Sequence, residues 1–234
     1  MLTLDNVHAE YGEVEVLSGI SLKVDEGQLV ALIGPNGHGK STVIKTVSGL
    51  LKPTDGEIIF DGEKVGGLPP DKIVEKGIVH VPEGSRLFPY MTVKENLLLG
   101  AYPKSSWKTR EKNLKSVYRL FPILEQRKKQ LASSLSGGER QMVALGRGLM
   151  CNVKLLMMDE PSMGLAPVVA DELYSKIGEV RKTGVSILIV EQNVKRIANS
   201  DRIFLIENGV VRLQGTSKEV LESDYLKHAY LGKT

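Results

Sequence analysis

The chain has 234 residues, of which 41% are hydrophobic and 25% are charged, and it carries a formal net charge of +3. This composition supports one or two compact domains and excludes disorder, while the small net charge gives no indication of nucleic-acid binding. The longest apolar runs, such as residues 185–190, are far shorter than the roughly eighteen residues that a membrane helix needs.

Neither the start of the chain nor its cysteine content indicates export. The first residues include no basic n-region and no apolar h-region, so we expect a cytoplasmic chain. The single cysteine, Cys151, can form neither an internal disulfide nor a metal cage, and we expect it to be a small buried residue.

Strand-like and helix-like segments follow one another in a way that predicts a core with an insertion. Residues 1–84 are rich in β-branched runs punctuated by Gly and Asp, which predict strands. Residues 85–153 are predicted to be a helical lobe, because Thr92 and Glu95 form a capping-box pattern and apolar residues follow at helical spacing. From residue 154 strands and helices alternate, which predicts a parallel α/β sheet and assigns 154–234 to one core lobe with the N-terminal part. The predicted strands are residues 2–7, 20–24, 29–33, 57–60, 155–158 and 187–190.

A glycine-rich segment follows the predicted strand 29–33 and precedes a helical stretch. Glycines let the backbone aim its amides at phosphate oxygens, and the helix start adds about half a positive charge. Because a triphosphate carries far more negative charge, a cation is needed; Lys40 supplies it, and Ser41 offers a hydroxyl to Mg²⁺. The alternative is a glycine-rich turn with an incidental lysine. The predicted P-loop residues are Gly34, Pro35, Asn36, Gly37, His38, Gly39, Lys40, Ser41 and Thr42.

Two acidic residues, Asp159 and Glu160, follow the predicted buried strand 155–158. In an open α/β sheet ligands bind at the carboxyl ends of the strands. Asp159 is suited to hold Mg²⁺ through water, and Glu160 can orient or deprotonate the water that attacks the γ-phosphate. Taken alone such a pair more often forms a turn, but the P-loop upstream favours the catalytic interpretation.

A third motif opens a predicted helix with Ser136, Gly137, Gly138 and Glu139. Ser136 and Glu139 satisfy the capping-box pattern, so the motif could be only a well-capped amphipathic helix that packs its apolar face. Two glycines at the first helical positions nevertheless cost about 1 kcal/mol each against alanine. We therefore expect close approach to a ligand, and exposed amides at a helix start indicate a second phosphate site.

These motifs, in this order, resemble those of the ABC ATPase family over essentially the whole chain: LSGGE as the signature, LLMMDEPS as the Walker B stretch and SMGLAP as the D-loop. The resemblance implies a P-loop NTPase fold with a RecA-like parallel-sheet core, an N-terminal antiparallel β subdomain and an inserted helical subdomain. It also implies a head-to-tail dimer, in which Ser136, Gly137 and Gly138 contact the γ-phosphate held by the partner's P-loop. Tyr11 matches the aromatic residue that stacks on adenine, although an isolated tyrosine is more often a core residue.

The sequence departs from the family pattern at three positions. Glu83 stands where most relatives have glutamine, and Gln192 stands where the family usually has a switch histidine; Gln192 can hydrogen-bond but cannot become cationic. His38 stands where a small residue is common, and we expect its side chain to point to solvent. The segments VPEGSRLFP, SMGLAP, VEQN and AYLG are similar to those of LivF-type ATPases of branched-chain amino-acid importers, a system that pairs two different ATPases.

The resemblance implies a set of cofactors, partners and roles. The cofactors are ATP and Mg²⁺; the catalytic set is Glu160, Lys40, Gln192 and Glu83. The partners are a second ABC ATPase subunit, two transmembrane permeases and, indirectly, a solute-binding protein, with no nucleic acid, and the chain would lie in the cytoplasm, peripheral to the inner face of the membrane. The loop from Glu83 to Tyr90 is expected to receive a short cytoplasmic helix of the permease and to transmit the closure of the ATPase subunits to it.

Two alternatives remain open. The ATPase of a urea or amide importer shares nearly every motif, since solute selectivity belongs to other subunits. A soluble ABC-type ATPase acting on ribosomes or DNA is the other alternative, but such proteins usually carry two cassettes or long coiled-coil insertions, and neither is found in this sequence.

Overall fold

The computed structural model describes residues 1–230, which divide into two compact units. Unit 1 comprises Met1–Leu68 together with the chain from Ser186 onward, and unit 2 comprises Pro69–Val185. Each unit contains both strands and helices.

The predicted lobes, 1–84 with 154–234 and the insertion 85–153, have other boundaries than these units, and that division remains a prediction. The predicted motif at residues 229–232 extends past the residues that the structure describes. Within residues 1–230, no helix is both long enough and apolar enough to span a membrane.

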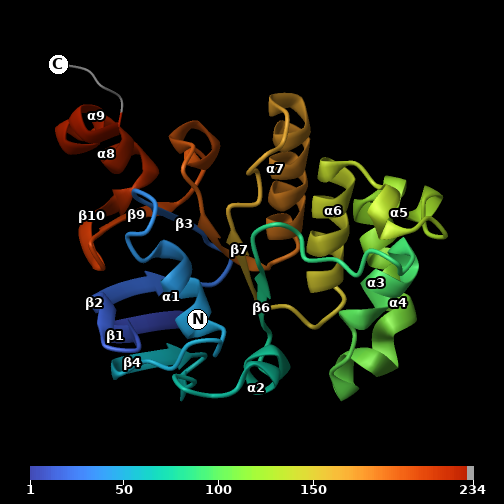
Figure 1. The fold of residues 1–234 in the computed structure, drawn as a ribbon, viewed down its shortest axis with the longest axis horizontal. Helices are drawn as coiled ribbons and strands as arrows, with labels where there is room; N and C mark the ends of the chain where they lie inside the picture. The colour runs from blue at the N-terminus through green and yellow to red at the C-terminus, as the bar shows by residue number, and fades with distance from the viewer. Residues whose placement is uncertain (231–234) are drawn as a thin grey trace. The chain divides into compact units, whose positions relative to one another are not determined.

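The first sheet of unit 1 has four strands that pair antiparallel. They are β1 (Leu2–Tyr11), β2 (Val14–Val24), β4 (Asp55–Phe60) and β5 (Glu63–Lys64), in the order β2-β1-β4-β5 (Figure 1). One face of β1 is buried, and Leu4 lies opposite Leu22 of β2, as expected of a sheet that covers a core on one side. The strands predicted at residues 2–7 and 20–24 are confirmed, but β1 and β2 extend further toward the turn that joins them. The prediction missed these extensions because the polar residues near the turn show no apolar alternation.

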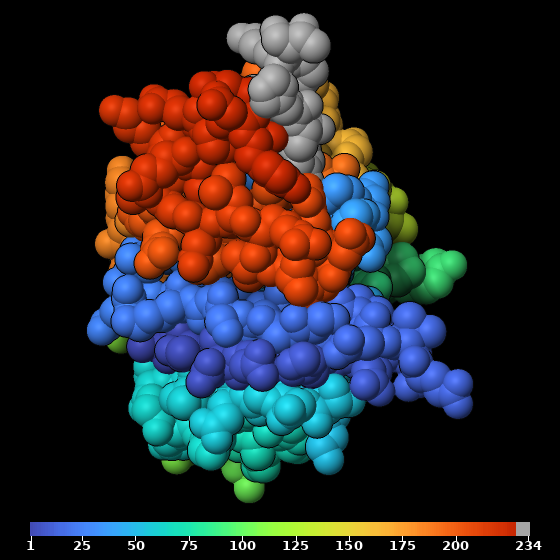
Figure 2. All heavy atoms as spheres, turned by 90° about the vertical axis from the view of Figure 1, so that its left-hand side faces the viewer, coloured from blue at the N-terminus to red at the C-terminus, as the bar shows by residue number. Residues whose placement is uncertain are grey.

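The second group of strands in unit 1 is β3 (Leu29–Ile33), β8 (Ser186–Val190), β9 (Arg202–Glu207) and β10 (Val210–Thr216). β3 pairs in parallel with both β8 and β9, and β10 pairs antiparallel with β9. Every residue of β8 and all but Leu29 of β3 are buried, which confirms the predicted apolar strands. The helices of unit 1 are α1 (Lys40–Val47), η2 (Val194–Ile197), α8 (Ser217–Glu222) and α9 (Asp224–Tyr230). Figure 2 shows the face on which β10 (orange-red) lies against β2 (blue). A groove of about 330 Å³ is lined by Gly19 and Ser21 of β2 and by residues 210–214 of β10.

Unit 2 combines two parallel strands with most of the helices. The strands are β6 (Ile78–Val81) and β7 (Leu155–Asp159), and Val81 lies opposite Met158. The helices are α2 (Pro70–Glu75), α3 (Val93–Leu99), α4 (Lys104–Leu120), α5 (Pro122–Gln126), η1 (Ala132–Ser134), α6 (Gly137–Gly148) and α7 (Pro167–Lys182). Both predicted capping boxes are confirmed, at Thr92 of α3 and Ser136 of α6. The short helix α2 was not predicted, because Ile73 is its one buried residue and gives no helical periodicity.

Candidate functional site

The glycine-rich loop of unit 1 follows β3 directly and packs against backbone. Gly34 has a φ of 146°, and a Cβ at this position would overlap the backbone carbonyl oxygen of Ile206 in β9. Gly39 has a φ of 105°, and a Cβ there would lie 3.0 Å from Leu17 Cδ2 and 3.2 Å from the Val16 carbonyl oxygen. Only glycine fits either position, so β2 and β9 determine the shape of the loop.

Lys40 is the first residue of α1, and its side chain folds back under the loop. It is 4% exposed, and its ammonium group donates to the carbonyl oxygens of Gly34 at 2.8 Å and Pro35 at 2.9 Å. Within the described residues, no side chain caps the start of α1, and no acidic residue lies in its first turn. A helix start with a fixed cation beside it is a site suited to an anion.

His38 does not simply point to solvent, so that prediction was wrong. The imidazole is half-buried, and Nδ1 accepts a hydrogen bond of 3.0 Å from the backbone N–H of Asn208. The backbone N–H of Gly209 donates to the carbonyl oxygen of His38 at 3.1 Å. The turn between β9 and β10 therefore holds the middle of the P-loop, through residues about 170 positions away in sequence.

Two further predicted residues belong to the same unit as the P-loop. Tyr11 ends β1 and is 45% exposed, and the Lys45 ammonium lies 5.8 Å from the centroid of its ring. Gln192 is exposed and follows β8. Because Leu32 of β3 lies opposite Val190 of the parallel strand β8, the P-loop and Gln192 leave the sheet at the same edge. The two functional segments of unit 1 are thus brought together by strand pairing.

The acidic pair and Glu83 show the same arrangement in unit 2. Asp159 ends β7 and is 5% exposed, and Glu160 follows with a φ of 45°. Glu83 is exposed two residues after β6, the parallel neighbour of β7. The three carboxylates therefore emerge at the carboxyl ends of adjacent strands. A left-handed conformation costs a residue such as Glu160 about 1–3 kcal/mol, and such strain is concentrated at functional sites.

The candidate metal ligands are oxygen donors of the type that Mg²⁺ prefers. Ser41, in the first turn of α1, offers a hydroxyl, and Asp159 offers a carboxylate. Among the described residues, no group of three His, Cys, Asp or Glu side chains could hold a metal ion by itself. Each of these oxygens is of a kind that binds Mg²⁺ together with phosphate and water, and the assignment of both residues as metal ligands remains a prediction.

The signature motif begins α6 with a complete capping box. The Glu139 N–H donates to Ser136 Oγ at 3.3 Å, the Ser136 N–H donates to Glu139 Oε2 at 2.8 Å, and Arg127 forms an ion pair of 2.6 Å with Glu139. A Cβ at Gly138 would overlap Val169 Cγ1 of α7, whereas a Cβ at Gly137 would lie 3.4 Å from its nearest neighbour, Leu165 Cδ2. Gly138 is thus explained by packing. Gly137 is not, and the ligand contact expected for it remains a prediction.

The loop after β6 contains a strained turn that the sequence did not reveal. Gly84, Ser85 and Arg86 have φ values of 77°, 61° and 41°, all in the left-handed region. Ser85 Oγ donates to Gln141 Oε1 at 2.5 Å, and the guanidinium of Arg147 donates to the carbonyl oxygens of Arg86 at 3.0 Å and Ser85 at 3.2 Å. Both partners belong to α6, and burial lowers the pKa of Arg147. Helix α6 therefore holds a turn whose two non-glycine residues cost about 1–3 kcal/mol each.

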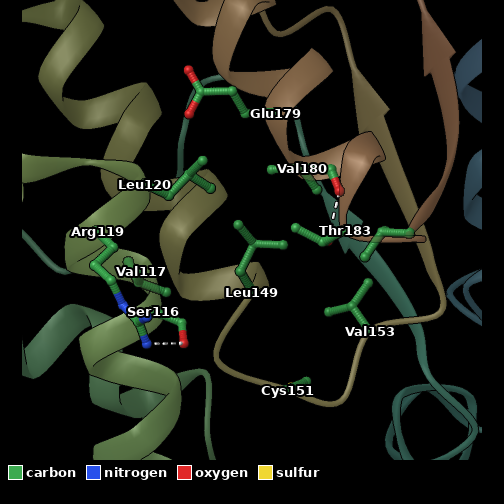
Figure 3. Close-up of a pocket in the computed structure, with 11 residues that line it drawn as sticks. Ser116, Val117, Arg119, Leu120, Leu149, Cys151, Val153, Glu179, Val180 and Thr183 are labelled. Atoms are coloured by element: carbon green, nitrogen blue, oxygen red, sulfur yellow. Dashed lines mark hydrogen bonds between the residues drawn. The ribbon is translucent and has the colours of Figure 1, made fainter.

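A separate cavity of about 550 Å³ lies in unit 2 between α4, α7 and the segment 149–153 (Figure 3). None of the predicted site residues lines it. Cys151, at its edge, is 8% exposed and donates from Sγ to the Gly100 carbonyl oxygen at 2.8 Å. This low exposure confirms the prediction of a small buried residue, and burial raises the pKa of the thiol to about 11.

Comparisons with known proteins agree with these motifs. The family model for ABC transporters matches residues 17–163. The high-affinity branched-chain amino acid transport ATP-binding protein BraG of Pseudomonas aeruginosa is 40% identical over 99% of this chain and 100% of its own length. The lipopolysaccharide export system ATP-binding protein LptB of Escherichia coli K12 is 32% identical over 99% of this chain and 97% of its own. A solved structure, the ADP conformation of an ATP-binding cassette of an ABC transporter, has a TM-score of 0.87 at 30% identity and covers 100% of this chain and 99% of its own.

The expected fold is confirmed by this structural likeness, with a parallel core sheet and an N-terminal antiparallel sheet. The family model covers more than half of the chain, and the relatives match it from end to end. The chain therefore belongs to the ABC transporter family, as the ATP-binding subunit whose ATP hydrolysis is coupled to transport.

Proposed function

We propose that this chain powers a branched-chain amino-acid importer, with ATP and Mg²⁺ bound by the P-loop and hydrolysis led by Glu160. The observation that supports the solute class best is the likeness to BraG, which extends over the full length of both chains. The segments VPEGSRLFP, around Glu83, and VEQN, around Gln192, support the same class.

In this proposal the P-loop amides and Lys40 hold the phosphates. Lys40 is already held at the loop by two carbonyl oxygens, so its charge is in place before a nucleotide binds. Tyr11, with 45% of its surface exposed, offers a ring face to adenine. Ser41 and Asp159 supply the protein oxygens for Mg²⁺, which would neutralise phosphate charge.

For hydrolysis, Glu160 orients or deprotonates the attacking water. Its place directly after the buried Asp159 supports this role, and so does its strained backbone. Glu83 follows β6, which pairs with β7, the strand before Glu160. Gln192 follows β8, which pairs with β3, the strand before the P-loop. We propose that both residues contribute polar contacts near the γ-phosphate.

The signature residues act on the nucleotide of another subunit in this proposal. The neighbours of Gly137 do not require a glycine, since an added Cβ would make only an ordinary contact of 3.4 Å with Leu165 Cδ2, and Ser136 carries a hydroxyl at the start of α6. The working complex pairs this chain with a second ABC ATPase, and the isolated chain can form a homodimer through the same surfaces.

The loop from Glu83 to Tyr90 is proposed as the contact with two permeases at the inner face of the cell membrane. Phe88 is 53% exposed and Tyr90 is 88% exposed, a high exposure for two large side chains so close in sequence. The backbone of Phe88 is fixed nonetheless, because buried Asn96 bonds both its N–H and its carbonyl oxygen.

Uptake by cells tests the solute. A strain that lacks this gene should lose ATP-dependent uptake of labelled leucine, isoleucine and valine, and the wild-type gene should restore it while Glu160→Gln should not. Loss of urea or amide uptake with normal leucine uptake would support the alternative importer. A defect in lipopolysaccharide export alone would favour the function named for LptB.

Gln192 predicts asymmetry between the two ATPase subunits. A neutral amide cannot supply the positive charge that a protonated histidine brings to the γ-phosphate, so this chain alone should be a poor ATPase. Turnover should rise when a histidine-bearing second subunit and the permeases are added, and should depend on that histidine more than on Gln192. Equal turnover by this chain alone and by the complex would contradict the asymmetry.

A further inference from the structure

Hydrogen bonds join the loop that follows β6 to the segment that carries the signature motif, at several points along unit 2. Before α6, the N–H groups of Ala132 and Ser133 donate to the carbonyl oxygens of Met91 and Pro89, each at 3.0 Å. Along α6, Gln141 and Arg147 bond the strained turn at Ser85 and Arg86. The loop is therefore attached on both sides of Ser136.

We propose that Gln141 and Arg147 are positioning residues, which hold the strained loop to α6 so that a displacement of the loop is passed to Ser136. This inference rests on the proposed function, in which the loop contacts the permease and Ser136 contacts a nucleotide. It adds a route between these two contacts that runs entirely within unit 2.

The contact between Ser85 and Gln141 is shielded from water. Ser85 is 7% exposed and Gln141 is 6% exposed, and the hydroxyl donates to the amide oxygen at 2.5 Å. If either side chain is removed, the other is left buried without this partner, because water cannot readily replace it. The bond therefore keeps the left-handed conformation of Ser85 linked to the middle of α6.

Arg147 holds two successive carbonyl groups with one planar side chain. Its Nη1 and Nη2 atoms bond the carbonyl oxygens of Arg86 and Ser85. A guanidinium presents several N–H groups in a fixed fork, whereas an ammonium is a point charge that matches this geometry poorly. The contact therefore depends on the shape of arginine as well as on its charge.

The route from the loop to Ser136 is stiff. Helix α6 is a continuous helix of 12 residues, and its capping box ties Ser136 to the first turn. Asn96 is fully buried and bonds the carbonyl oxygens of Phe88 and Met91 at 3.0 and 3.2 Å. Because Asn96 belongs to α3, these bonds fix the loop at Phe88 to a second helix, so a push on the exposed side chain of Phe88 is not absorbed by loop motion.

The test uses the transporter assembled from this chain, its second ATPase subunit and the permeases in proteoliposomes. Gln141→Leu should lower ATP turnover roughly 5-fold, as expected for loss of one buried hydrogen bond. KM for ATP should stay unchanged, since the P-loop is intact. Gln141→Glu keeps an acceptor for the Ser85 hydroxyl and should restore most of the turnover. Gln126→Leu is the matched control, because Gln126 is exposed on α5.

Two further variants sharpen the test, and the second of them, Arg147→Lys, keeps it decisive if Gln141→Leu folds poorly. Ser85→Ala combined with Gln141→Leu should be no slower than either single variant, because both remove the same bond. Arg147→Lys keeps the charge and should lower turnover with KM unchanged. Additive effects in the double variant, or full turnover by Arg147→Lys, would overturn the proposal. Wild type and Glu160→Gln are run in parallel, and equal turnover by these two would refute the proposed catalytic role instead.

Discussion

The two helices that follow glycine-rich motifs differ in how well their N-termini suit an anion. Helix α1 of unit 1 follows the N-cap residue Gly39 and has neither an acidic residue in its first turn nor, among the described residues, a side-chain cap. Helix α6 of unit 2 follows the N-cap residue Ser136, has a complete capping box and carries Glu139 in its first turn. The start of α1 therefore suits a strongly bound anion, whereas the start of α6 already has an acid of its own.

The two motifs also differ in what requires their glycines. Gly34 and Gly39 are required by left-handed conformations and by close contact with the backbone of neighbouring strands. Gly138 is required by one side chain, Val169, and Gly137 has room around it. Backbone cannot yield to a new methyl group, but a side chain can. The P-loop should accordingly be the less tolerant of the two motifs.

The largest effect is expected for Gly34→Ala. The new Cβ would overlap the Ile206 carbonyl oxygen, and no rotamer change can relieve this contact. We expect a loss of about 3 kcal/mol in the free energy of unfolding, measured by urea titration, and loss of nucleotide binding. Gly62→Ala is the control, because Gly62 has a φ of 82° but no neighbour within 4 Å of an added Cβ. Equal losses in both variants would mean that φ strain, not the overlap, determines the effect.

A smaller effect is expected for Gly138→Ala. The added methyl group would meet Val169 Cγ1, which can move, so we expect a loss of about 1–2 kcal/mol in the free energy of unfolding. A second substitution, Val169→Ala, should recover part of that loss by making room. Gly137→Ala should leave the stability nearly unchanged. If Val169→Ala gives no recovery in the double variant, packing against α7 does not explain Gly138.

The smallest effect is expected for His38→Ala. This change removes the acceptor of the Asn208 N–H at a half-buried position, where water can take over part of the bond. We expect a loss of about 0.5–1 kcal/mol in the free energy of unfolding and a small decrease in ATP affinity, by calorimetry. His38→Asn offers another acceptor, so its free energy of unfolding should lie between those of the wild type and His38→Ala. A loss as large as that of Gly34→Ala would contradict the ranking.

The sequence predicted the parts of the fold and site that depend on local pattern. The strand before the P-loop, the buried strand before Asp159 and the capping boxes at Thr92 and Ser136 are all confirmed. These features need only apolar runs or polar residues at fixed spacing. The functional roles assigned to the site residues remain predictions.

The contacts that were not predicted join residues far apart in the chain. His38 bonds Asn208, Ser85 bonds Gln141, and Gly138 packs against Val169. No local pattern identifies such pairs, since each depends on which elements the fold brings together. The prediction that His38 points to solvent was wrong for this reason: its partner lies in the turn between β9 and β10.

The most direct test compares Glu160→Gln with Lys40→Ala, by measuring the affinity for ATP in the presence of Mg²⁺ and the steady-state hydrolysis of the assembled complex. Glu160→Gln removes the base but keeps the shape and hydrogen bonding, so we expect unchanged affinity and a fall in turnover of about 10²- to 10⁴-fold. Lys40→Ala removes the cation that the P-loop holds in place, so both affinity and turnover should fall. Near-normal turnover by Glu160→Gln, or unchanged ATP affinity in Lys40→Ala, would contradict the proposed division between hydrolysis and binding.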